Sequence, residues 1–223
     1  MASSSLDPLL PKDLRDAVIR NSGTADDLKH LATGDTFAKI LPVLRGYGEV
    51  VPTNHLELLQ NTTMIHGLPL GFVPKEKFVK DTNSLAKVKI ESLSRNFTTW
   101  FLSGSKREDH PTRSMLYSYR ILKLSKDMEI IRELCREGAD EVKLVEIFSL
   151  LEKQGDGQKE GALSVEHGNV FYSQSAKDLT RAILVDWGNV GWCISSQETE
   201  TEMRWRPDFR VFSHNLIING KRF

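Results

Sequence analysis

The stretch ILVDWGNVGWCI, residues 183–194, constrains the fold more than any other segment, because apolar residues alternate on both sides of a short turn. Gly188 and Asn189 suit a two-residue turn, since both tolerate positive φ. The cross-strand pairs that this turn predicts are Trp187 with Val190, Val185 with Trp192, and Ile183 with Ile194. Side chains alternate along a strand, so this apolar set shares one face. The stretch therefore predicts a β-hairpin laid on a hydrophobic core.

The first 66 residues favour short helices. Thr24 begins one helix, with Asp27 placed for a capping box, and Asn54 caps another in NHLELLQNT. The glycine- and proline-rich segment GLPLGFVP then marks an internal boundary. We predict a helical amino-terminal region, 1–66, followed by an α+β core, 67–223, within one compact domain overall.

Periodicity changes after this boundary. Strands are predicted in LAKVKIE (85–91), FTTWFL (97–102) and SMLYSYRILKLS (114–125). Helices are predicted in KDMEIIRELCRE (126–137) and EVKLVEIFSLLEK (141–153), packed together as a hairpin. A further hairpin, turning at His214 and Asn215, is predicted in DFRVFSHNLIINGKRF (208–223). The fold class is therefore α+β: short amino-terminal helices, a mainly antiparallel sheet interrupted by a two-helix hairpin, and carboxy-terminal β-hairpins.

Composition limits the classes of function. Basic and acidic side chains balance at 30 each, so an attraction to nucleic acid or to an acidic membrane surface would need a local basic patch. The sequence has no apolar run of about 20 residues that could span a bilayer and no secretory signal. Its two cysteines lack a zinc-like spacing. We expect a cytoplasmic or nuclear protein without a transmembrane segment, bound metal or cofactor.

Motifs of catalysis are missing from the sequence, which contains no phosphate-binding loop, no HExxH and no GxSxG. This favours a non-enzymatic interaction or self-assembly protein, whose partner is another protein or a second copy. A viral structural protein of the matrix type, or a viral accessory protein, would combine these features. An enzyme whose catalytic residues are dispersed along the sequence stays open as an alternative.

A basic and aromatic loop, residues 103–120, is the candidate nucleic-acid interface. Its residues are Lys106, Arg107, His110, Arg113, Tyr117 and Arg120. Cations neutralise phosphates and aromatic rings stack on bases, so this combination suits RNA. The alternative is a solvated loop before a core strand, because Glu108 and Asp109 dilute the positive charge.

Two further segments are candidates for binding a protein partner. VDWGN resembles the turn of Tudor domains, and the resemblance implies an aromatic pocket for methylated arginine or lysine that involves Trp187 and Asn189. RWRPDFR places Arg204 and Arg206 on either side of Trp205. The alternatives are a purely structural hairpin and a strand edge whose charges prevent aggregation.

Overall fold

The structure, a computed structural model, describes residues 16, 18, 24–32, 40–41, 45, 54–66, 71–105, 107–108, 113–134, 141–218 and 221–222. The chain forms two compact units, 1–51 and 52–223. The first contains helix α2, Ala25–Ala32. The Thr24 backbone N–H donates to Asp27 Oδ2 at 2.7 Å, and the Asp27 N–H donates to Thr24 Oγ1 at 3.3 Å. The predicted capping box is confirmed.

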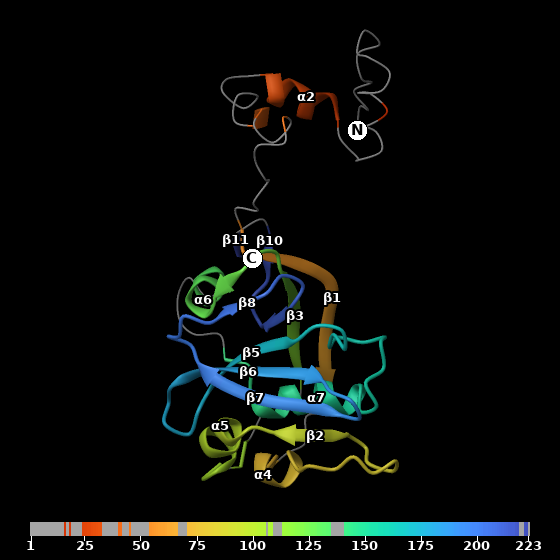
Figure 1. Ribbon diagram of the computed structural model, residues 1–223, viewed down its shortest axis with the longest axis vertical. Coiled ribbons are helices and arrows are strands. Elements are labelled where there is room, and N and C mark those ends of the chain that lie inside the picture. The colour runs from red at the N-terminus through yellow and green to blue at the C-terminus, as the bar shows by residue number, and fades with distance from the viewer. Residues whose placement is uncertain are drawn as a thin grey trace. The chain divides into compact units, whose positions relative to one another are not determined.

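The second unit is built on a seven-stranded mixed sheet of order β1-β3-β9-β5-β6-β7-β2 (Figure 1). Its strands are β1 (Leu56–His66), β2 (Ile90–Leu93), β3 (Arg113–Ile121), β5 (Asn169–Gln174), β6 (Thr180–Trp187), β7 (Trp192–Glu198) and β9 (Arg210–Ser213). Neighbouring strands are antiparallel except for the parallel pairs β5–β9 and β2–β7. Short ladders join β4 (Ser125–Lys126) to β8 (Arg204–Trp205) and β10 (Ile217–Ile218) to β11 (Lys221–Arg222).

The helices of the second unit are short. They are α4 (Pro74–Lys77), α5 (Arg95–Phe97), the π-helix η1 (Thr98–Leu102), α6 (Asp127–Leu134) and α7 (Leu144–Lys153). The combination of these helices with a mostly antiparallel sheet confirms the α+β class. No helix in the described part of the chain is long and apolar enough to cross a membrane.

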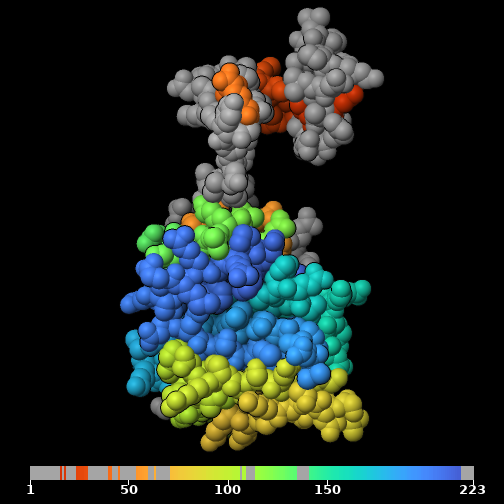
Figure 2. All heavy atoms as spheres, in the orientation of Figure 1, coloured from red at the N-terminus to blue at the C-terminus, as the bar shows by residue number. Residues whose placement is uncertain are grey.

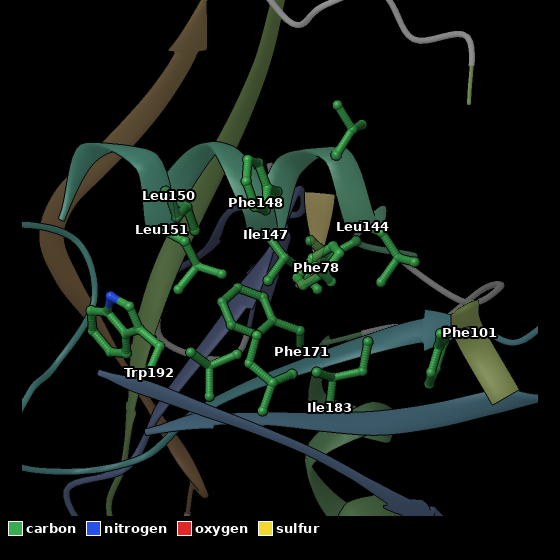
Figure 3. Close-up of a cluster of buried hydrophobic side chains, with 14 of the residues drawn as sticks. Phe78, Phe101, Leu144, Ile147, Phe148, Leu150, Leu151, Phe171, Ile183 and Trp192 are labelled. Carbon is green, nitrogen blue, oxygen red and sulfur yellow. The ribbon is translucent and has the colours of Figure 1, made fainter. Parts of the chain in front are cut away.

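Two hydrophobic cores lie on opposite faces of the sheet, because successive side chains of a strand point to opposite sides. On β5, Phe171 belongs to the first core, whereas Val170 and Tyr172 belong to the second. Helix α7 covers the first core, and Figure 3 shows its apolar side chains directed at Phe171 of β5 and Ile183 of β6. Helix α6 and β8 cover the second core. The two helices follow one another in the chain as expected, but the sheet lies between them.

The central hairpin forms from β6 and β7, with a register that differs from the predicted one. Trp187 pairs with Trp192 and Val185 with Ile194. The connecting loop has four residues, 188–191, closed by a 2.8 Å hydrogen bond from the Gly188 N–H to the Gly191 carbonyl. The predicted two-residue turn is therefore wrong. A shift of two residues leaves the side chains of both strands on their predicted faces, so the apolar face of the strands is preserved. Val190, predicted on that face, lies instead in the loop and is exposed.

Two local predictions are wrong for tertiary reasons. NHLELLQNT contributes to strand β1, not to a helix, because Leu56 packs in the second core while β1 pairs with β3. Residues 56–66 consequently belong to the sheet, within the compact unit 52–223. FTTWFL lies in α5 and η1, since Phe97 and Phe101, four residues apart, both enter the first core.

The carboxy-terminal strands also pair differently from the prediction. Strand β9 does not turn back at His214 and Asn215 to form a hairpin; it lies between β3 and β5 in the main sheet. The two residues between β10 and β11, 219–220, lie outside the described residues.

Candidate functional site

A cavity of about 270 Å³ lies where the loop after η1, the first residue of α7 and the β5–β6 turn meet. The residues that line it are Phe101, Gly104, Ser105, Arg107, Glu108, Leu144, Gln174, Ser175, Ala176 and Asp178. Phe101 and Leu144 are buried and provide apolar wall. The cavity therefore combines a small apolar wall with a larger number of polar and charged side chains, so it is more polar than the mostly apolar pockets that bind drug-sized ligands.

Glu108 is the most electrostatically unusual residue of this cavity. One of its carboxylate oxygens accepts a 3.1 Å hydrogen bond from the Val145 N–H at the start of α7. Burial raises the pKa of Glu108 to about 7, although the Val145 hydrogen bond and the charge of Lys143 act in the opposite direction. Its side chain can therefore be protonated or ionised near neutral pH, as acid–base groups and tunable binding groups are.

A second carboxylate at the start of α7 is held in the ionised form. Glu146 is fully buried, accepts a 2.8 Å hydrogen bond from the Lys143 N–H, and lies 2.8 Å from His214 Nε2. Burial alone would raise its pKa, but hydrogen bonds with His214 and Ser114 reverse this and lower the pKa below its ordinary value. The order of contacts, with the carboxylate between Ser114 and His214, does not match a nucleophilic triad, in which the histidine stands in the middle.

The predicted nucleic-acid residues do not form one surface where their side chains are described. Arg107 lines the cavity and lies against the backbone of Gly71. Tyr117 packs on the second core. Arg120 lies three positions further along β3, so its side chain points to the opposite face of the sheet, where it forms an ion pair with Glu57. The side chains of Lys106, His110 and Arg113 lie outside the described part of the structure. The RNA-binding hypothesis stays a prediction.

The residues that carry the Tudor resemblance occupy different environments. The Trp187 ring packs edge-on against Trp192, with ring centroids 5.1 Å apart, and it also lies against Gly157, where a Cβ atom would come within 2.5 Å of it. Asn189 is exposed on the loop, which Glu91 of β2 holds by accepting a 2.9 Å hydrogen bond from the Val190 N–H. The geometry accounts for the tryptophans as packing groups of the hairpin.

The residues of the RWRPDFR segment also differ in exposure. Arg204 and Arg206 are exposed, but Trp205 is 2% exposed and donates from Nε1 to Asp127 Oδ1 at 2.6 Å. Burial raises the pKa of Asp127, against the hydrogen bonds from Trp205, Tyr172 and Gln197. Trp205 therefore anchors β8 over the second core, and the two arginines are the part of the predicted partner site that lies on the surface.

The β1 edge of the sheet is a second candidate site. The Leu122 N–H donates to the His55 carbonyl at 2.9 Å, so the backbone groups of His55 face β3. Backbone groups of successive residues in a strand point in opposite directions, and the N–H groups of Leu56 and Leu58 therefore point away from β3. Glu133 of α6 accepts hydrogen bonds from the N–H groups of His55 and Leu56, at 2.8 and 3.2 Å. Among the described residues, the Glu133 carboxylate therefore bonds to the start of this edge and not to the N–H groups further along β1.

Comparison of the chain with protein-family models, curated proteins and solved structures finds no match. Within the described residues, no group of three or more His, Cys, Asp or Glu side chains is placed to hold a metal ion.

Sequence reasoning missed most of the cavity. It treated Glu108 only as a charge that weakens a basic loop, and it assigned no role to Ser105, Gln174 or Asp178. These residues lie on two segments that are distant in the sequence, and Leu144 of α7 adds a third, so no local motif could have joined them. The sequence did show an acidic residue, Glu108, in this loop, and carboxylates are stabilised at the N-termini of helices. It did not show which helix Glu108 meets, because α7 is distant in the sequence.

Proposed function

We propose that the protein is a self-assembly protein whose copies associate through strand β1. The observation that carries this proposal is the length and composition of the edge: β1 has 11 residues, and those from Leu58 to Ile65, LLQNTTMI, contain no charge, proline or glycine. Natural edge strands are usually short or interrupted by such residues, which prevent pairing with other chains. A long uncharged edge favours addition of another strand.

The occupant that fits best is β1 of a second copy. Register shifts between Leu58 and Thr62, so a bulge interrupts the strand and leaves Thr62–His66 as its regular part. Antiparallel pairing of this segment with itself about a two-fold axis satisfies both free edges at once and closes the assembly. So short a ladder buries little surface, and we expect a weak, concentration-dependent dimer.

Solution mass tests the proposal. Light scattering over a range of protein concentrations should show a reversible monomer–dimer equilibrium in the full chain. The double variant Asn61→Lys/Thr63→Lys, which adds like charges to the edge, should weaken the dimer at least about tenfold.

The matched control is Asn96→Lys/Thr99→Lys, which changes the same two residue types at exposed positions of α5 and η1. It should leave the dimer unchanged. Circular dichroism verifies folding, and the single variant Asn61→Lys, within the bulge, serves if the double variant is unfolded. A wild-type chain that stays monomeric, or a dimer that is insensitive to the β1 lysines, would contradict the proposal.

A further inference from the structure

Two carboxylates, those of Glu108 and Asp178, line the cavity beside α7. Neither Glu108 nor Asp178 forms an ion pair with any residue that the structure describes. Glu108 uses one oxygen for the Val145 N–H, and the hydroxyl of Ser105 is buried without a hydrogen-bond partner in the described part of the chain. The wall therefore offers three groups with unused capacity to accept hydrogen bonds.

The charged surroundings of Glu108 are more acidic than basic. Glu141 and Glu146 raise its pKa and Lys143 lowers it, while Glu146 is already engaged by His214. Arg107, the cation of the cavity wall, lies with its guanidinium against Gly71, where a Cβ atom would come within 2.3 Å of Cζ. A cation entering the cavity would offset the cost of burying the Glu108 charge.

We propose that this cavity binds a primary alkylammonium group, with the ammonium held by Glu108, Asp178 and Ser105 and its alkyl stem against Phe101 and Leu144. An ammonium has three N–H donors, which matches the three acceptors of the wall. The volume of about 270 Å³ suits a group the size of a lysine side chain, below the range of drug-sized sites. This site is independent of the β1 edge.

Isothermal titration calorimetry of the full chain with n-butylammonium chloride tests the site, with 1-butanol and sodium butyrate as neutral and anionic probes of similar size. Butylammonium should bind saturably, and about tenfold more tightly at pH 8 than at pH 6, because Glu108 ionises between these values. The two other probes should not bind. Nα-acetyl-lysine methylamide identifies the source: tighter binding than butylammonium indicates a lysine of a peptide, and equal or weaker binding indicates a free amine.

Two variants assign the binding to this cavity. Glu108→Gln keeps an oxygen that can accept from Val145, and it should weaken binding and abolish the dependence on pH. Asp178→Asn should weaken binding without unfolding the turn, since Asp178 has φ +57° and asparagine tolerates this region. Asp208→Asn, at an exposed position with φ +71°, is the matched control and should change nothing. Absence of saturable binding, preference for butyrate, or full affinity in Glu108→Gln would overturn the proposal.

Discussion

The two edges of the sheet differ in how completely the fold closes them. Strand β2 has four residues, and both backbone groups of Ile90 are bonded to Asp81: the Asp81 N–H donates at 3.0 Å and the Ile90 N–H at 2.8 Å. Figure 2 shows the yellow and yellow-green atoms around α4, β2 and α5 covering this end of the sheet. Strand β1 has 11 residues, and in the described part of the chain α6 bonds only to the N–H groups at its start. Closure depends on neighbouring segments, not on the strand alone.

The same contrast extends into the hydrophobic cores. Trp192, on β7 next to β2, is fully buried and donates from Nε1 to the Gln154 carbonyl at 2.9 Å. On β1, Leu58 is only partly buried against the second core. Residues near the closed edge should therefore determine the stability of the fold, whereas residues of the open edge should affect association more than folding.

The largest expected effect is the loss of Trp192. Trp192→Ala removes a buried indole and leaves the Gln154 carbonyl without its donor, so it should lower the free energy of unfolding by about 3–5 kcal/mol. Leu58→Ala at the open edge should lower it by about 1–2 kcal/mol, because less apolar area is removed from the core. Urea denaturation followed by tryptophan fluorescence and circular dichroism measures both. Equal losses would contradict the comparison.

The next effect is a dependence of folding stability on pH, caused by Glu108. Burial raises the pKa of Glu108 in the folded chain from 4.5 to about 7, so its contribution to stability is complete below pH 4.5 and is lost as the pH rises through 7. Relative to Glu108→Gln, the free energy of unfolding of the wild type should fall by at most about 3 kcal/mol between pH 5 and pH 8. Urea titrations at several pH values measure this difference, and a difference that is constant or rises with pH would contradict it.

The smallest change in stability should come from opening the β2 edge. Asp81→Pro removes the N–H that binds the Ile90 carbonyl and should cost about 1 kcal/mol. It should also create a second pairing edge, so that light scattering detects species larger than a dimer. Asp81→Ala retains the N–H and is the control. Unchanged mass in the proline variant would indicate that α4 and α5 close this edge without Asp81.

The sequence predicted the elements whose pattern is local. The α+β class, the Thr24–Asp27 cap and the apolar faces of α7 and of the 183–194 hairpin follow from periodicity and capping chemistry. The register of that hairpin did not, because Glu91 on β2 and Lys89 help to fix the four-residue loop: the Trp192 N–H donates to the Lys89 carbonyl at 2.7 Å. The candidate cavity was predictable only through Arg107, one residue of its wall.

Sequence alone thus determined which side chains share a face, since that depends on a period of two or of 3.6 residues along the chain. Tertiary structure decided which faces and edges meet. NHLELLQNT lies in β1 because it pairs with β3. Helices α6 and α7 do not pack on each other because they cover opposite faces of the sheet. Glu108 acquired its pKa of about 7 because folding buried it at the start of a helix 36 residues away in the sequence. Such long-range contacts leave no local periodicity to read.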